Sequence, residues 1–339
     1  MIARRSVWSD PNVVELTQNF VPVADEVARL QRGTDPEARL FQTIAEQGHY
    51  AGYGPPKHTG TRQGTYAAAP SGVLLASINS NDPAKMADML RRALEKWQTL
   101  SCEERLLAND PHAVADEAAR ARGERLYPEG GLVLRVDTRD LPRNDSVREE
   151  PGKWHATAVN QDFAWFTKDE ARQFVPENPA PSQVHEVPEP LIRRLARIHF
   201  VDNVRGQTPG YHDDAVKTAR LTGTVTGVDG PRVSLRLDGE VRLSAEGTWP
   251  VNDRHDADNP QPHQRGFEGR LLGYATWDGE KQRFVAFEMV AAGTRWGATQ
   301  YNVRNGDADP APLGFALTLA GDTLAERVAP AAYWHYGWK

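Results

Sequence analysis

The chain has 339 residues, of which 39% are hydrophobic and 25% charged, a balance typical of a soluble globular protein with room for two domains. Its net charge of −6 is spread along the sequence, and no apolar run is long enough to span a bilayer. This argues against nucleic acid and against a membrane as partners. Cys102 is the only cysteine, which excludes an internal disulfide and a multi-cysteine metal site within this sequence.

The residues after Met1, IARRS, are polar and include no apolar region of the kind found in secretory signal peptides. For the sequence as it stands, a cytoplasmic location is expected.

Asp-Pro pairs mark the first third of the chain, at Asp10, Asp35, Asp82 and Asp110. An aspartate accepts hydrogen bonds from the free N–H groups of a first helical turn, and a proline there lacks an N–H that would have no partner. Each pair therefore predicts the start of a helix. The helix after Asp82 is the most regular, because apolar residues from Met86 to Trp97 recur at intervals of three and four.

Short apolar runs lie between these helices. Residues 20–25, FVPVAD, are expected to form a buried strand. Residues 64–69 and 73–78 flank Pro70-Ser71-Gly72, a turn signal typical of a hairpin. The expected order is helix, strand, helix, strand, turn, strand, helix.

The stretch VWSDPNVVELTQNFVPV resembles the part of thioredoxin-like proteins that leads from the active-site helix into the next strand. The later stretch APSGVLLASINSNDPAKMADMLRRAL is similar to the closing hairpin and last helix of that fold. The resemblance covers about residues 5–100. It implies an α/β thioredoxin-like N-terminal domain, residues 1–100, that is incomplete because its first strand is missing.

The family's catalytic features are not found in this sequence. Its CxxC motif lies at a helix N-terminus, where the helix dipole lowers a thiol pKa, and the family's spacing puts the second cysteine just before Met1. The positions of the family's cis-proline read Arg62-Gln63-Gly64. Cys102 is no substitute, since Glu103 and Glu104 beside it would raise a thiol pKa. No catalytic residue and no cofactor are therefore predicted within the chain.

The leading hypothesis is a thiol- or selenol-disulfide oxidoreductase whose CxxC or CxxU motif is encoded upstream of Met1. In its most specific form, the motif contains a selenocysteine whose UGA codon has been taken for a stop. The partner would then be a protein disulfide substrate. The alternative is a redox-inactive thioredoxin-fold protein that binds a protein partner or serves as a scaffold, and whether the protein is an enzyme depends on this choice.

Residues 101–125 are charged and alanine-rich, which is typical of a helical connector. Residues 188–200 predict an amphipathic helix, and the alternation of Val233, Leu235 and Leu237 with polar residues predicts a half-buried strand. Several such runs are separated by Asp-Gly turns. Residues 126–339 are therefore predicted to form a β-rich α+β domain, an antiparallel sandwich or an open barrel, of unknown function.

Three residues in this domain are weak candidates for metal ligands: His255, Asp256 and His263. Imidazole and carboxylate groups are common metal ligands, but their stretch has neither HxH nor HExxH spacing. A solvated surface loop is the simpler interpretation.

Four further residues are candidates for a binding surface: Arg205, Arg295, Trp296 and Tyr301. Arginine beside aromatic residues is typical of binding surfaces and also of ordinary cation–π packing. The chain ends AAYWHYGWK, and so many exposed aromatic residues would promote aggregation. We therefore expect this segment to dock on the β-rich domain.

Overall fold

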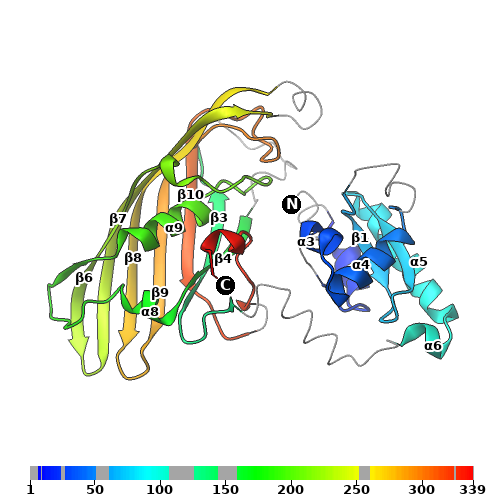
Figure 1. Cartoon of the computed structure of the whole chain (residues 1–339), viewed down its shortest axis with the longest axis horizontal. Coiled ribbons are helices and arrows are strands. Elements are labelled where there is room, and N and C mark those ends of the chain that lie inside the picture. Colours follow the sequence, from blue (N-terminus) through cyan, green and yellow to red (C-terminus); the bar gives the residue numbers. More distant parts are fainter. Residues whose placement is uncertain are drawn as a thin grey trace. The chain divides into compact units, whose positions relative to one another are not determined.

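A computed structural model of the chain divides into two compact units, residues 1–125 and 126–339, here the N-terminal and C-terminal units (Figure 1). The structure describes residues 7–8, 10–23, 27–50, 61–106, 126–143, 159–251, 260–323 and 326–338. The Asp-Pro pair at Asp110 and most of the predicted connector lie outside these residues. Each unit is considered by itself.

The described part of the N-terminal unit combines helices with a two-stranded antiparallel sheet. Its elements are α2 (Pro11–Thr17), α3 (Val27–Arg32), α4 (Pro36–Glu46), β1 (Thr65–Ala68), β2 (Leu74–Ile78), α5 (Pro83–Thr99) and α6 (Cys102–Arg105). Asp10, Asp35 and Asp82 are the N-caps of α2, α4 and α5, and each accepts hydrogen bonds from N–H groups of the first turn. The three predicted helix starts are confirmed.

Helices cover both faces of this small sheet. On one face, Ala67 of β1 belongs to an apolar cluster with Val13 of α2 and Met86 of α5. On the other face, Tyr66 of β1 makes an edge-on contact with Phe41 of α4, with ring centroids 5.5 Å apart. Because successive residues of a strand point to opposite faces, the two contacts place α4 opposite α2 and α5.

The strand predicted over residues 20–25 is wrong for the part that the structure describes. Residues 20–23 form no strand, and Val21 and Val23 are 89% and 79% exposed. A strand forms only where a neighbouring strand can satisfy its backbone N–H and C=O groups. Among the described residues, β1 pairs only with β2, and no strand lies ready to pair with residues 20–23.

The C-terminal unit is built on one antiparallel sheet with the strand order β4-β3-β10-β9-β8-β7-β6-β5. The strands are β3 (Leu132–Asp140), β4 (Val159–Phe166), β5 (Val184–Glu186), β6 (Val216–Asp229), β7 (Arg232–Trp249), β8 (Gln261–Asp278), β9 (Arg283–Trp296) and β10 (Ala311–Leu319). Consecutive hairpins join β6 to β9, and their register runs without interruption between β7 and β8.

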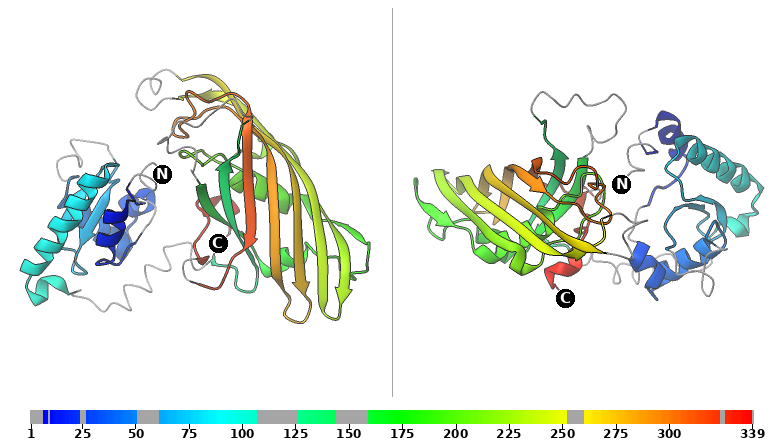
Figure 2. Two further views of the ribbon diagram at one scale, coloured as in Figure 1. Left: turned by 180° about the vertical axis from the view of Figure 1, so that it is seen from behind. Right: turned by 90° about the horizontal axis from the view of Figure 1, so that it is seen from above.

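Helices α8 (Lys168–Arg172) and α9 (Glu189–His199) cover one face of this sheet, which we call the inner face (Figures 1 and 2). Short 3-10 helices are η3 (Asp213–Ala215) and η5 (Tyr333–Tyr336). Helix α9 confirms the amphipathic helix predicted over 188–200, and its Leu191 and Ile192 belong to the main core. Val233, Leu235 and Leu237 are buried in the same core, as the alternation predicted.

A β-rich, antiparallel C-terminal unit agrees with the prediction; of the two architectures that the prediction left open, a sandwich or an open barrel, the sandwich is not formed by the described strands. All described strands of the unit lie in one sheet, and its end strands β4 and β5 do not pair with each other. The inner face is buried under α8 and α9, so a second sheet is not needed to cover it. Among the described residues, no helix is both long and apolar enough to cross a lipid bilayer.

The C-terminal segment packs against the edge strand β4, as expected for its aromatic residues. Tyr336 Oη accepts a hydrogen bond from the Trp165 N–H at 3.0 Å and lies 2.7 Å from His199 Nε2. The Ala331 N–H donates to the carboxylate of Asp162 at 2.8 Å. The segment therefore satisfies polar groups of an edge that would otherwise be open to other strands.

Candidate functional site

A network of arginines and aspartates lies at the end of the sheet where β3 and β9 finish. Its members are Arg143, Arg205, Arg295, Arg304, Asp140, Asp202 and Asp307. Asp140 is the last residue of β3 and Arg295 is next to the last of β9, so the sheet brings them to the same end. Arg304 and Asp307 belong to residues 297–310, which connect β9 to β10 and which we call the β9–β10 loop.

Arg304 is the centre of the network. Its side chain is fully buried, and it donates to Asp140 Oδ1 at 2.6 Å and to Asp202 Oδ2 at 2.8 Å. Burial acts to lower the pKa of Arg304, but the hydrogen bonds and charges of the two aspartates outweigh it and raise the pKa. The guanidinium therefore stays charged and pins the β9–β10 loop to the sheet.

The carboxylate of Asp307 forms ion pairs with four guanidinium groups. The nitrogen–oxygen distances are 2.6 Å to Arg143, 2.9 Å to Arg205, 2.6 Å to Arg295 and 3.1 Å to Arg304. Burial acts to raise the pKa of Asp307, but the hydrogen bond from Arg143 and the charges of Arg295, Arg205 and Arg143 outweigh it, so the pKa lies below its ordinary value. Asp307 therefore remains a carboxylate and holds the four cations together.

Arg295 also fastens the backbone of the β9–β10 loop. It is 1% exposed, and its Nη1 donates to the carbonyl oxygens of Asp307 and, at 3.1 Å, of Asp309. The structure thus places Arg205 and Arg295, two of the predicted binding residues, among carboxylates of their own unit. Their chemistry here is to hold a loop in one shape.

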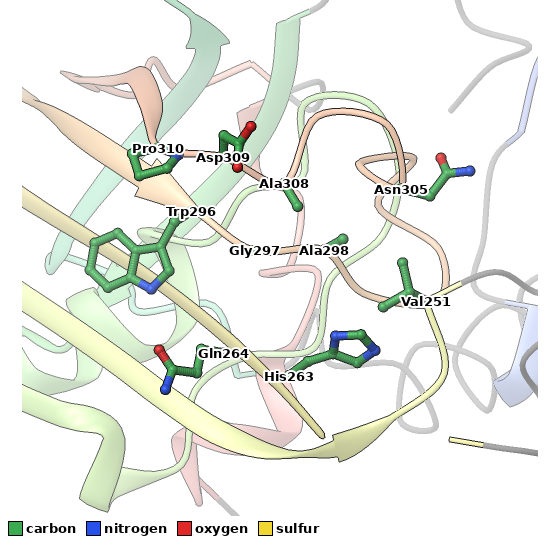
Figure 3. Close-up of a pocket in the computed structure, with 10 residues that line it drawn as sticks. All are labelled: Val251, His263, Gln264, Trp296, Gly297, Ala298, Asn305, Ala308, Asp309 and Pro310. Atoms are coloured by element: carbon green, nitrogen blue, oxygen red, sulfur yellow. The ribbon is translucent and has the colours of Figure 1, made fainter. Parts of the chain in front are cut away.

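A groove lies beside this loop, where β7 ends and β8 begins, and Figure 3 shows the first of its two hollows. Its first hollow has a volume of about 370 Å³, and the side chains that line it include Trp296, His263, Gln264, Asn305 and Asp309. A second hollow of about 510 Å³ adjoins the first and shares His263 and Gln264. We call the two hollows together the β7–β8 groove.

The indole of Trp296 lies on the outer face of the sheet. Trp296 pairs with Gly266 of β8, and a Cβ atom on Gly266 would lie only 2.1 Å from Cζ2 of the indole. The ring therefore uses the space that the glycine leaves open. The neighbours Arg265 and Arg295 are buried, so by strand alternation Trp296 and Gln264 point to the opposite, outer face.

The other predicted site residues do not gather in the groove. Tyr301 is 54% exposed, and its carbonyl oxygen accepts a hydrogen bond from the Gln207 N–H. His255 and Asp256 lie outside the described residues, while His263 lines the groove next to the ring of Trp249. The described part of the chain holds no group of three or more side chains that could bind a metal ion.

Sequence reasoning missed the aspartates of the network. Arg304 contacts Asp140 across 164 residues and Asp202 across 102 residues. The stretch NVRNGDADP places Arg304 and Asp307 close together in sequence, but acidic and basic residues are common in turns. No local pattern distinguishes a buried ion-pair partner from a solvated one.

In the N-terminal unit, the structure describes Cys102 and Gly64. Cys102 is exposed at the start of the short helix α6. Gly64 directly precedes β1, and a Cβ atom there would lie 2.5 Å from the His49 ring. The edge of β1 that does not pair with β2 has no strand partner among the described residues.

No protein-family model matches the chain, and neither the curated proteins nor the solved structures contain a match to it.

Proposed function

We propose that the protein is a thioredoxin-like thiol- or selenol-disulfide oxidoreductase whose reactive pair lies outside these 339 residues. The observation that supports this proposal is that one edge of β1, and the strand-like residues 20–23, have no strand partner among the described residues. Among the described residues, the sheet of the N-terminal unit has helices on both faces but only two paired strands.

A further strand at this edge could pair with two segments at once, β1 on one side and residues 20–23 on the other. It would take up the unpaired N–H and C=O groups of Thr65–Ala68. It would also offer a partner to residues 20–23, whose Val21 and Val23 are exposed although a sequence of this kind normally forms a buried strand. In thioredoxin-like proteins, the strand between these two elements leads directly into the CxxC motif.

The chemistry would be thiol–disulfide exchange. A thiolate or selenolate of the pair attacks one sulfur of a substrate disulfide, the S–S bond breaks, and the leaving thiolate takes up a proton. The second cysteine then attacks the mixed intermediate and releases the other substrate thiol, which leaves the reactive pair oxidised. An external dithiol must reduce the pair before the next cycle. Cys102 takes no part.

The test begins with the DNA before the Met1 codon. If the upstream frame encodes Cys-x-x-Cys or Cys-x-x-TGA, we expect the longer chain to reduce insulin disulfides with dithiothreitol as electron donor. Serine in place of the attacking cysteine or selenocysteine should abolish this activity, whereas Cys102→Ser should leave it unchanged. An upstream frame with neither motif, or activity of the 339-residue chain that survives Cys102→Ser, would contradict the proposal.

Hydrogen exchange separates the fold from the chemistry. In the longer chain, amides of Thr65–Ala68 and of Phe20, Val21 and Val23 should exchange more slowly than in the 339-residue chain, because they gain strand partners. Protection without disulfide reduction would favour the redox-inactive binding protein instead.

A further inference from the structure

We propose that Asn305 and Gly306 of the C-terminal unit form a site of spontaneous modification, where the Asn305 side chain is converted through a cyclic imide into aspartate and isoaspartate. This inference is independent of the proposed redox function, because it concerns a different unit and needs no thiol. It rests on the sequence of one turn in the β9–β10 loop, on the exposure of its two central residues and on the anchors at both of its ends.

The residue pair itself favours the reaction. Asn305-Gly306 is the only Asn-Gly pair in the sequence. The backbone nitrogen of the residue that follows an asparagine can attack the asparagine amide and close a five-membered ring. A side chain on the following residue obstructs this approach, whereas glycine has no Cβ atom and its backbone rotates most easily. Glycine at position 306 therefore removes the main steric obstacle to the attack.

The two residues occupy the centre of a turn from Arg304 to Asp307. The Asp307 N–H donates to the Arg304 carbonyl oxygen at 2.8 Å, and Asn305 and Gly306 lie between these two residues. Both central residues are exposed, and a Cβ atom built on Gly306 would meet no atom of the described residues within 4 Å. The space around the turn therefore allows the Gly306 nitrogen to rotate toward the Asn305 amide carbon.

Neither reacting group makes a hydrogen bond to another described residue. This holds for the Gly306 N–H and for the Asn305 amide, and Figure 3 shows that amide pointing away from the other labelled side chains. Asn302 in the same loop is the opposite case. It is 2% exposed, and its Oδ1 accepts hydrogen bonds from two backbone N–H groups. The loop therefore contains one protected asparagine and one that is open to attack.

The reaction consumes one water molecule and releases one ammonia, with no oxidation or reduction. The Gly306 backbone nitrogen loses its proton to solvent base and attacks Cγ of Asn305. A C–N bond forms, the Cγ–Nδ2 bond breaks, and the amide leaves as ammonia after it takes up a proton. Water then opens the cyclic imide. Cleavage between the nitrogen and Cγ gives aspartate, and cleavage between the nitrogen and the main-chain carbonyl carbon gives isoaspartate.

Isoaspartate lengthens a turn whose two ends are fixed. Its backbone runs through Cβ and Cγ, which places one more backbone atom between Arg304 and Asp307. Arg304 is held by Asp140 and Asp202, and the Asp307 carboxylate is held by four guanidinium groups. A longer connection displaces one of these anchors, whereas aspartate keeps the original backbone. Isoaspartate at position 305 should therefore loosen the ion network.

The experiment follows the 339-residue chain during incubation at physiological temperature and mildly alkaline pH. Peptide mapping by mass spectrometry locates deamidated residues, and protein isoaspartate methyltransferase with labelled S-adenosylmethionine measures isoaspartate. We expect Asn305 to be converted first among the described asparagines, with isoaspartate as one product. Asn302 should remain an amide. Asn79, which is exposed but precedes Ser80, should be converted several-fold more slowly than Asn305.

Two substitutions test the cyclic-imide route. Gly306→Ala should be tolerated by the fold, because Gly306 has no positive φ and its surroundings are open, but the new side chain should slow deamidation several-fold. Asn305→Gln enlarges the ring to six members and should nearly abolish deamidation at this position. The matched control is Gly227→Ala, since Gly227 in β6 also has open space and no positive φ. It should leave the rate at Asn305 unchanged.

Urea unfolding tests the effect on the network. The isoaspartate form, separated by ion exchange, should unfold at a lower urea midpoint than the unmodified chain. Asn305→Asp reproduces the aspartate product and should keep the unmodified midpoint, because the backbone is not lengthened.

Absence of conversion at Asn305 would overturn the inference, and so would equally fast conversion at Asn79. A rate that is unaltered by Gly306→Ala, or deamidation without any isoaspartate, would replace the cyclic imide with direct hydrolysis of the amide. An isoaspartate form with the unmodified midpoint would contradict the loosening of the network.

Discussion

The sheets of the two units end in different ways. In the C-terminal unit, β4 is covered by the C-terminal segment through Tyr336, and the other edge strand, β5, has only three residues. In the N-terminal unit, the described part of the sheet leaves one edge of β1 free while Val21 and Val23 are exposed. Proteins normally cover or shorten the edges of their sheets. In the proposed function, a further strand would pair with the free edge of β1.

The units also differ in their buried charges. The C-terminal unit buries Arg304 and Arg295 and satisfies them with aspartates. Among the described ion pairs of the N-terminal unit, the most buried is Arg29–Asp35, whose side chains are 15% and 12% exposed, against 0% for Arg304 and 1% for Arg295. The C-terminal unit should therefore depend more strongly on its charged groups. The following changes test both parts of this comparison.

Acid should have the largest effect, and mainly on the C-terminal unit. For Asp140, Asp162, Glu170 and Asp307, burial acts to raise the pKa, but ion pairs and hydrogen bonds outweigh it and the pKa is lowered. A carboxyl whose pKa is lower in the folded state stabilises the fold above its unfolded pKa of about 4. That stabilisation is lost as the pH falls through the folded pKa. Acid protonates all four carboxylates, so the loss of unfolding free energy should exceed the loss caused by any single substitution.

Hydrogen exchange between about pH 6 and about pH 2, corrected for intrinsic exchange rates, follows each unit by its own peptides. Peptides of the C-terminal unit should lose protection below about pH 4, and more steeply than those of the N-terminal unit. Equal losses in the two units would contradict the comparison.

Arg304→Ala should be the most damaging of the substitutions. It leaves Asp140 and Asp202 partly buried without their main counter-charge, which typically costs about 3–5 kcal/mol of unfolding free energy. Urea unfolding followed by tryptophan fluorescence measures this loss. The control is Arg236→Ala, because Arg236 forms an exposed pair with Asp238 and its loss should leave the midpoint unchanged. Equal effects of the two variants would show that the network contributes little.

Tyr336→Phe should have an intermediate effect. The hydroxyl lies between the Trp165 N–H and His199 Nε2, and without it both groups lose a buried hydrogen-bond partner. The expected loss of unfolding free energy is about 1–3 kcal/mol, with faster exchange of the Trp165 amide. Tyr333→Phe is the control, because the Tyr333 hydroxyl makes no hydrogen bond to another described residue. A native exchange rate at Trp165 in Tyr336→Phe would mean that the segment does not protect the edge.

Val21→Lys should have the smallest effect in the 339-residue chain. Val21 is 89% exposed, so a charged residue there should change the unfolding free energy by less than about 0.5 kcal/mol. In a longer chain that supplies the further strand, the same substitution should be clearly destabilising, because position 21 would then lie in a paired strand. Loss of more than about 1 kcal/mol in the 339-residue chain would show that the segment is already packed there.

The sequence identified individual groups of the candidate site but not their arrangement. Trp296 and His263 were singled out by residue type, and they line one groove because β8 and β9 pair so that Trp296 meets Gly266. Arg205 and Arg295 were singled out as binding residues, and their aspartate partners come from distant parts of the chain. Neither the register nor these partners can be read from a local pattern.

The features that the sequence determined by itself depend only on interactions between residues close together in the chain. The caps at Asp10, Asp35 and Asp82 need only the next few N–H groups, and the alternation around Leu235 needs only a period of two. Tertiary structure decided the rest, because pairing needs a second partner whose position no neighbouring residue sets. Residues 20–23 have strand character but form no strand without a partner among the described residues, and Arg304 acquires its role only where the fold brings Asp140 to it across 164 residues.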